Sequence, residues 1–224
     1  MLLLLKRGDT MLNIRGYSLG PVQTNCYIVA NKQKECLIFD PGEEAAFLIK
    51  ELRKQQVKPL AILLTHAHFD HIGAVDALRE EYEVPLYIHK DEASWLTDPL
   101  KNGSGKYAEL PNYVMQPAKE EHLLSAEGEM TIGSFTFTIA HTPGHSPGSV
   151  SYIFNSDGFA IVGDTLFRGS VGRTDLIGGS MKVLTASIQQ KLLTLPEETI
   201  LYPGHGEYTT PEMEMNSNPF LNGF

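Results

Sequence analysis

The sequence predicts an α+β domain, with β-sheets in the interior and helices on the outside. Short runs of β-branched, aromatic and aliphatic residues, each ended by Gly, Pro, Asn or Ser, recur along the chain and are typical of strands. Segments of helical periodicity interrupt these runs in both halves. The run 60–64, Leu-Ala-Ile-Leu-Leu, is apolar throughout, which indicates a strand covered on both faces. Because the 224 residues contain no low-complexity linker, we expect one domain over 1–224.

The first half of the chain predicts a parallel pair of strands inside a mixed sheet. Ala46, Ile49 and Leu52 share one face of a helix expected over about 43–57. A second helix, over about 73–82, separates the buried run from the next strand, and a strand–helix–strand order implies parallel neighbours. The strands expected in this half are 12–19, 26–30, 36–40, 60–64 and 85–89.

The second half predicts further short strands after a long irregular segment. Residues 91–128 predict a short helix with long loops, and we expect this segment to contact substrate because long irregular segments in compact domains tend to be functional. A helix is expected over about 181–193, and residues 218–221 are expected to pack as a terminal clip. The strands expected here are 130–132, 135–140, 150–154, 159–162 and 200–202.

The charge and hydropathy of the chain exclude two classes of partner. There are 18 basic and 27 acidic side chains, so the net charge is −9. Because a phosphate backbone requires a basic surface, we expect no nucleic-acid partner. No apolar stretch reaches the roughly 20 residues that span a membrane, so we expect no membrane contact.

The first ten residues and the cysteines favour a cytoplasmic protein. The N-terminal apolar run is too short for a signal peptide, and Lys6 and Arg7 follow it instead of preceding it. We expect residues 1–10 to be an N-terminal extension or the result of an upstream start. Cys26 and Cys36 are expected to be free and buried, although their positions also permit a disulfide. Nothing in this cysteine usage requires an oxidising compartment.

The strongest chemical signal follows the buried strand at 60–64. Three imidazoles and a carboxylate lie within six residues, in Thr-His-Ala-His-Phe-Asp-His over 65–71. His66 and His68 are two residues apart, so at a strand end they point the same way. Asp70 and His71 fall where the chain turns into a helix and can face a second point. The spacing predicts metal binding, and four ligand-type side chains in so short a loop favour two adjacent ions.

Three more ligand-type side chains follow strands elsewhere in the chain. His145 lies in His-Thr-Pro-Gly-His, Asp164 in Val-Gly-Asp-Thr, and His205 in Tyr-Pro-Gly-His. Taken singly, each is equally well explained as a turn residue or an exposed histidine. Ligand sites of open α/β sheets gather at the carboxyl ends of strands, so we expect these three to join the 66–71 loop.

These segments in this order resemble the metallo-β-lactamase superfamily. Three motifs are most similar to its glyoxalase II (hydroxyacylglutathione hydrolase) branch, in the small single-domain bacterial form. They are Thr-His-Ala-His-Phe-Asp-His-Ile-Gly, His-Thr-Pro-Gly-His-Ser-Pro-Gly-Ser and Gly-Asp-Thr-Leu-Phe. The resemblance covers residue 12 to the end. It implies an αββα four-layer sandwich, with mixed sheets inside and the site at one sheet edge.

The resemblance also implies how the ligands divide and what they do. His66, His68 and His145 would hold the first metal, Asp70, His71 and His205 the second, and Asp164 would bridge both. Two divalent ions are expected, with Zn²⁺ first and Fe or Mn also admitted by ligands that are all N and O. A hydroxide bridging the metals would attack the carbonyl of a small acyl thioester, with Asp70 orienting it as the catalytic residue. A thiolate is a good leaving group and needs no strong acid, so His89, His122 and His141 are expected to be structural, with His141 also a candidate to support a metal ligand from outside.

The substrate and several alternatives remain open on the sequence alone. Arg173 stands where the family places a basic glutathione-binding residue, but Asp175 replaces an expected tyrosine, and only 224 − 205 = 19 residues follow His205, too few for the helical glutathione-binding domain. A surface role for Arg173 is the alternative. A mononuclear-iron persulfide dioxygenase, a phosphodiesterase or nuclease, and a metal-binding protein without catalysis are the other functions considered. The sequence does not predict the oligomeric state.

Overall fold

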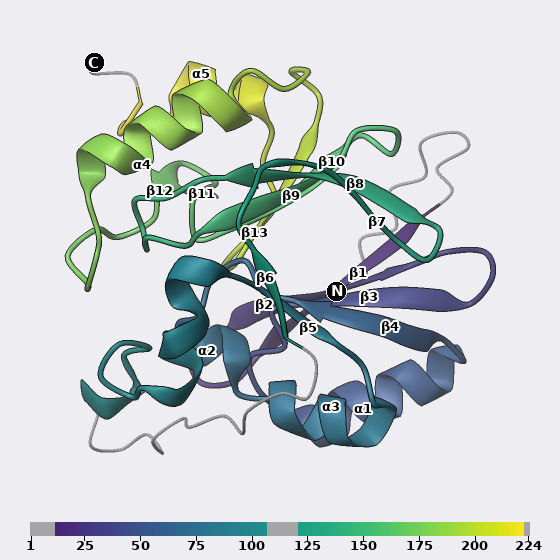
Figure 1. Ribbon diagram of the computed structural model, residues 1–224. Coiled ribbons are helices and arrows are strands. Elements are labelled where there is room, and N and C mark those ends of the chain that lie inside the picture. Colours follow the sequence, from purple (N-terminus) through teal and green to yellow (C-terminus); the bar gives the residue numbers. More distant parts are fainter. Residues whose placement is uncertain (1–11, 107–120, 222–224) are drawn as a thin grey trace.

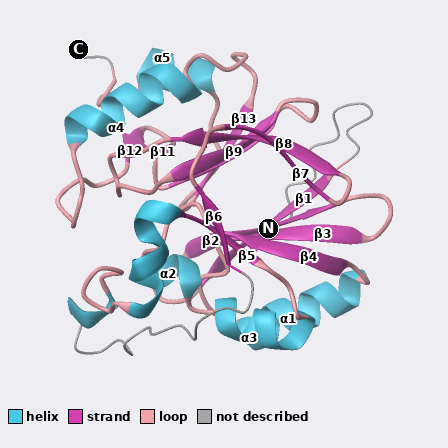
Figure 2. Ribbon diagram, in the orientation of Figure 1, coloured by secondary structure: helices cyan, strands magenta, loops and turns pink. Residues whose placement is uncertain are grey.

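Two mixed β-sheets pack face to face, and helices cover the outer face of each (Figure 1). The computed structural model describes residues 12–106 and 121–221. The predicted class and the αββα arrangement are confirmed. Figure 2 shows the two strand layers between the two helical layers. The expected N-terminal extension at 1–10 lies outside the described residues.

The first sheet has six strands in the order β1-β2-β3-β4-β5-β6. The pairs β3–β4, β4–β5 and β5–β6 are parallel, which confirms the predicted parallel pair, and β1–β2 and β2–β3 are antiparallel. Its strands are β1 (Asn13–Leu19), β2 (Thr24–Ala30), β3 (Glu35–Phe39), β4 (Lys58–Leu63), β5 (Leu86–His89) and β6 (Glu121–Leu124). Its helices are α1 (Ala45–Gln55), α2 (Phe69–Ile72), α3 (Val75–Tyr82) and the 3₁₀ turns η1 (Lys90–Thr97) and η2 (Ser104–Lys106).

The second sheet has five strands in the order β13-β10-β9-β8-β7, with only β10–β13 parallel. Its strands are β7 (Gly128–Ile132), β8 (Phe135–His141), β9 (Val150–Phe154), β10 (Phe159–Gly163) and β13 (Ile200–Pro203), and a small hairpin pairs β11 (Leu166–Phe167) with β12 (Ser170–Val171). The outer layer contains α4 (Met181–Ser187), a π-helical turn η3 (Ile188–Leu192) and α5 (Pro211–Ser217).

Alternation along the strands produces three buried apolar layers. In β2, Tyr27 and Val29 face the second sheet while Ile28 faces α1 and α3. Between the sheets, aromatic rings interlock, for example Phe39 against Tyr152 at 5.2 Å between centroids. The two cysteines are buried and free, as expected.

The structure departs from the predicted elements in several places. The helix expected over 73–82 is observed as α3, and a further short helix that was not predicted, α2, begins in the ligand loop at Phe69. Strands β6, β11 and β12 were not predicted, because two to four residues are too few to show the alternation of apolar and polar side chains that indicates a strand. Helix α5 was also missed, although Thr210 caps it by accepting a hydrogen bond from the backbone N–H of Met213. Part of the segment 91–128, at 107–120, lies outside the described residues.

No helix in the described ranges combines the length and the apolarity that crossing a lipid bilayer would require.

Candidate metal centre

The seven predicted ligand side chains meet at one edge of the sandwich. His66 and His68 follow β4, Asp70 and His71 lie in α2, and the loop after β8 carries His145. Asp164 directly follows β10, and His205 comes two residues after β13. All four segments, which follow β4, β8, β10 and β13, meet at this edge, so the predicted juxtaposition is observed.

Their donor atoms fall into three overlapping groups, each within 4.8 Å. The groups are His66–His68–His145, Asp70–His71–His205 and His66–His71–Asp164. Nδ1 of His68 lies 2.9 Å from Nε2 of His145, and Nε2 of His205 lies 3.2 Å from Oδ2 of Asp70. The first two groups are the two ligand sets that the resemblance implied.

Asp164 lies between the two sets. Its Oδ1 is 3.5 Å from Nε2 of His71, and its Oδ2 is 3.6 Å from Nε2 of both His145 and His205. One carboxylate therefore faces histidines of both sets, which is the position a bridging ligand requires.

The cluster has the character of a cation site. Nε2 of His66, Nε2 of His71 and Oδ1 of Asp164 are buried without a hydrogen-bond partner in the part of the chain that the structure describes. Leaving such atoms unpaired in a core is costly, and several together at one point favour a bound ion. Imidazole and carboxylate donors suit Zn²⁺ and also Fe or Mn. The residues present therefore fit divalent metal.

The electrostatics of the cluster keep its carboxylates ionised. Burial raises the pKa of Asp164, but His71, His145 and His205 outweigh it and lower the pKa to about 2. Burial likewise opposes ionisation of Asp70, yet His71, His205 and Thr24 hold its pKa below the usual range. Burial, reinforced by His145, lowers the pKa of His68 to about 3, so this imidazole is neutral at pH 7, the form that binds metal.

Asp40 is a buried residue of the site that the sequence did not single out. Its carboxylate accepts hydrogen bonds from the backbone N–H and the hydroxyl of Thr65, both at 2.7 Å, and its Oδ2 lies 3.1 Å from Nδ1 of His71. It therefore orients His71 from behind, as outer carboxylates do for ligating histidines. In the sequence, Asp40 stands only in the turn Asp40-Pro41-Gly42. In the structure, its φ is 48°, in the left-handed region that residues other than glycine rarely adopt.

Thr24 and Glu92 were missed for a different reason, since their partners are distant in the sequence. The Thr24 hydroxyl donates to Oδ2 of Asp70 at 2.7 Å. Glu92 is fully buried and accepts from the backbone N–H groups of Ala67 at 2.6 Å and Gly148 at 2.7 Å. It thereby ties the loop of His66 and His68 to the loop of His145.

Comparison with known proteins now identifies the family. The model of the metallo-beta-lactamase superfamily matches residues 19–205, which span every residue of the cluster. The chain belongs to the metallo-beta-lactamase superfamily. Membership and the His/Asp donor set together make it a metallo-hydrolase of that superfamily.

Two curated relatives of this superfamily match almost the whole chain. It is 48% identical to the probable metallo-hydrolase YqgX of Bacillus subtilis, over 94% of this chain and 98% of YqgX. It is 35% identical to the hydroxyacylglutathione hydrolase GloC of Haemophilus influenzae, over 94% of this chain and 99% of GloC.

Two crystal structures of superfamily members show the same fold. The BLEG-1 B3 metallo-beta-lactamase is 52% identical, with a TM-score of 0.90 over 94% of this chain and all of that one. The protein TTHA1623, solved in a di-iron-bound form, is 39% identical, with a TM-score of 0.81 over 92% of this chain and all of that one.

The backbone of Arg173, the predicted substrate-binding residue, contacts the cluster of seven ligand residues. Its carbonyl accepts a hydrogen bond from Nδ1 of His145 at 2.8 Å, which leaves Nε2 of that histidine free to ligate. Its guanidinium forms a two-pronged pair with Asp175, both bonds at 2.7 Å. Both side chains are more than half exposed, so the pair lies on the surface beside the cluster. A role for this guanidinium in substrate binding stays a prediction.

Proposed function

We propose that the chain hydrolyses thioesters of the hydroxyacylglutathione type, using two divalent metal ions held by the seven-residue cluster. The observation that carries this proposal is the 35% identity to a hydroxyacylglutathione hydrolase over nearly the full length of both proteins. The cluster supports it, because one edge of the sandwich brings together six donor residues in two sets and a seventh between them.

The side chains divide into ligands and residues that hold the ligands in place. We assign His66, His68 and His145 to the first ion, Asp70, His71 and His205 to the second, and Asp164 to both. Bound ions at these positions supply a water that ionises near neutral pH and positive charge beside a developing oxyanion. Zn²⁺ is the first candidate, and Fe or Mn fit the same donors; a relative in a di-iron form supports iron.

Asp70 is the residue to which we assign orientation of the attacking water. Its carboxylate is ionised and held at Oδ2 by the Thr24 hydroxyl, so it can accept a hydrogen bond from water and fix the direction of attack on the thioester carbonyl. The departing thiolate has a parent thiol pKa of about 8.5 and leaves without a proton donor. The described residues near the cluster therefore need to supply no strong general acid.

Metal content and thioester turnover, measured together, test the proposal. The metal-loaded chain is expected to hydrolyse D-lactoylglutathione, and Asp70→Ala to lose metal and at least about 100-fold in kcat/KM, because ligands matter more than the outer residues that cost 10- to 100-fold. Asp76→Ala, which removes a carboxylate from the outer helix α3, serves as the matched control and is expected to keep both. Metal lost from Asp70→Ala with hydrolysis undiminished would defeat the mechanism, and a loaded wild type inactive on every thioester tried would defeat the function.

A second candidate is β-lactam hydrolysis, favoured by the 52% identity to a protein described as a B3 metallo-beta-lactamase. The same loaded sample, given a chromogenic cephalosporin, discriminates the two: a kcat/KM for the cephalosporin above that for every thioester would replace our proposal. Oxygen consumption with glutathione persulfide, measured with an oxygen electrode, tests the iron dioxygenase alternative. That enzyme would consume oxygen and bind one iron.

A further inference from the structure

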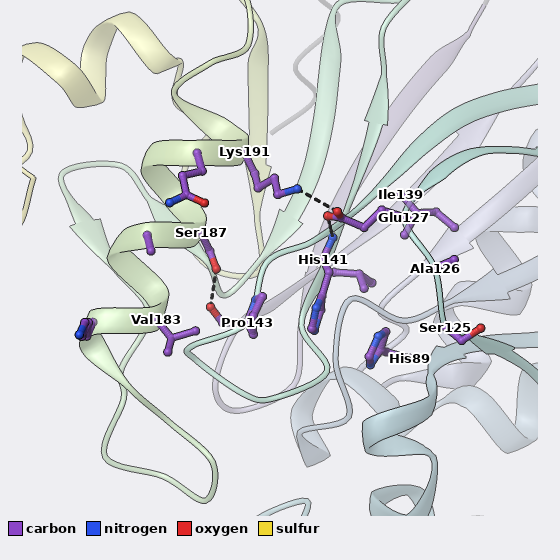
Figure 3. A pocket seen from close by; sticks show the side chains of 14 residues that line it. His89, Ser125, Ala126, Glu127, Ile139, His141, Pro143, Val183, Ser187 and Lys191 are labelled. Atoms are coloured by element: carbon purple, nitrogen blue, oxygen red, sulfur yellow. Dashed lines mark hydrogen bonds and ion pairs between the residues drawn. The ribbon is translucent and has the colours of Figure 1, made fainter.

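A second group of histidines lies away from the seven-residue cluster, where the two sheets approach each other. His89 is the last residue of β5 in the first sheet, and His141 is the last residue of β8 in the second. Their rings stack, with centroids 4.4 Å apart and an angle of 11° between planes. Figure 3 shows both rings side by side at the wall of a cavity of about 640 Å³, which Glu127 and Lys191 also line.

A carboxylate completes a donor set at this position. Oδ2 of Asp91 lies 3.6 Å from Nδ1 of His89. One ring nitrogen of His89, one of His141 and a carboxylate oxygen of Asp91 all lie within 4.8 Å of one another. Packing of the two rings alone would explain their stacking but not the carboxylate beside them. Two imidazoles and a carboxylate form a donor set that binds first-row divalent ions.

The hydrogen bonds of the two rings indicate which ring nitrogen of each histidine could bind such an ion. Nε2 of His141 lies 2.9 Å from the carbonyl of Pro147, which can only accept, so Nε2 carries the hydrogen and Nδ1 has the lone pair. Nδ1 of His89 accepts a long and therefore weak hydrogen bond of 3.4 Å from the backbone N–H of Asp91, and an ion bound at this nitrogen would replace that bond. Donation of the other ring N–H to a backbone carbonyl, as in His141, is the usual arrangement of a ligating histidine.

Charges of both signs surround this position, since Lys182 and Lys191 line the cavity together with Glu127, and Asp91 lies beside His89. Lys191 lies in the same cavity, but its ammonium pairs with Glu127 at 2.9 Å, and the other carboxylate oxygen of Glu127 accepts from the backbone N–H of His141 (Figure 3). The carboxylate of Asp91 is 46% exposed and can rotate toward the rings. Water from the open cavity can fill the remaining coordination positions.

We propose that His89, Asp91 and His141 form a separate binding site for one transition-metal dication such as Zn²⁺, joining the ends of the two sheets. This site goes beyond the proposed function and uses none of its seven ligands. Three donors, one of them exposed, make a weaker site than the buried cluster, so the ion is expected to exchange with solution.

Occupancy of this site acts on two segments that hold the cluster. His89 is the N-cap of η1, whose Glu92 accepts hydrogen bonds from the backbone of Ala67 and Gly148. His141 begins the loop that carries His145 and is tied through its ring to Pro147 of that loop. An ion between His89 and His141 therefore restrains the loop of His145 from both sides.

Equilibrium dialysis of the metal-loaded, gel-filtered protein against Zn²⁺, with metal counted by mass spectrometry, tests the site. Wild type is expected to take up one more Zn²⁺ per chain than His141→Ala, whatever number the main cluster holds, so failure of the proposed function does not affect this reading. Asp91→Asn, which keeps the shape of an exposed side chain, is expected to weaken that uptake at least about tenfold. It keeps the proposal testable where His141→Ala does not fold.

The matched control is His122→Ala, which removes an exposed imidazole that also stacks on a ring, that of Tyr87, with centroids 4.5 Å apart. It is expected to bind as wild type does. Equal uptake by wild type, His141→Ala and Asp91→Asn overturns the site, as does an equal loss in His122→Ala. Hydrogen exchange over residues 142–149 is expected to slow with added Zn²⁺ in wild type but not in Asp91→Asn; no slowing in wild type overturns the restraint of the loop.

Discussion

The charged groups of the buried cluster lack partners for some of their atoms, whereas those of the exposed loop beside it pair with each other. In the cluster, Asp164 and Asp70 face several histidines at 3.2–3.6 Å, and atoms such as Nε2 of His66 have no partner in the described chain. In the loop after β12, Arg173 and Asp175 satisfy each other at 2.7 Å in water. Several unpaired ligand atoms buried at one point favour a bound ion, whereas a solvent-exposed ion pair contributes little to stability.

From this difference we expect the cluster to carry metal binding and turnover, and the loop to influence substrate affinity. The cluster is positioned by buried contacts to Asp40, Thr24 and Glu92, so changes there are expected to affect metal and turnover. The loop carries exposed charges beside the cluster, so we expect changes there to affect the affinity for substrate. Three substitutions test this separation, in order of decreasing effect, and a thiol reagent then tests the core between β2 and β3.

Gly204→Ala is expected to damage the cluster most. A Cβ at this position would lie 2.0 Å from Oδ1 of Asp164 and 2.8 Å from Cε1 of His71, so both ligands must move. Metal affinity is expected to fall by more than about 100-fold, since displaced ligands cost more than lost outer partners. Gly206→Ala is the matched control, because a Cβ there meets nothing within 4 Å, although its φ of +76° strains the chain. Equal metal content in both variants, measured after dialysis, would contradict the prediction.

Asp40→Asn is expected to weaken metal binding by about 10- to 100-fold while the fold persists. The amide keeps an acceptor for Thr65 but removes the negative charge 3.1 Å from Nδ1 of His71. Competition with a chelator measures the affinity. An unchanged affinity would show that Asp40 only organises the turn after β3.

Asp175→Asn is expected to lower the KM for D-lactoylglutathione by a few-fold with kcat unchanged, because it removes the carboxylate that pairs with the Arg173 guanidinium and would repel an anionic substrate. Since the pair is exposed, thermal stability should change little. Steady-state kinetics of Asp175→Asn and of Arg173→Gln/Asp175→Asn distinguish the cause. A fall in KM that persists in the double variant would show that Arg173 is not responsible.

The smallest effect is expected at the cysteines. Burial raises the pKa of the Cys36 thiol to about 12 and that of Cys26 well above its ordinary value, so both remain protonated thiols at pH 8, the unreactive form. A thiol reagent at pH 8 is expected to label neither in the folded protein and both in denaturant. Rapid labelling under native conditions would indicate opening between β2 and β3.

Much of the metal cluster could be predicted because its signals are local. The spacing of His66, His68 and Asp70 lies within one loop, and each remaining ligand follows a buried strand and a Gly turn. Asp40 could have been suspected only as a turn residue, and Glu92 not at all, because its partners Ala67 and Gly148 lie on two other segments. Strand β6 and helix α5 were missed because short elements carry too few residues for a period.

The sequence by itself determined the strand ends and the donor types that follow them, since side-chain alternation and turn chemistry depend on neighbouring residues. Only the tertiary structure decided which donors face one another. It set Asp164 between two histidine sets, placed the carbonyl of Arg173 against His145 and stacked His89 of one sheet on His141 of the other. Such pairings depend on how two sheets pack, and packing is settled by the whole core and not by any one segment.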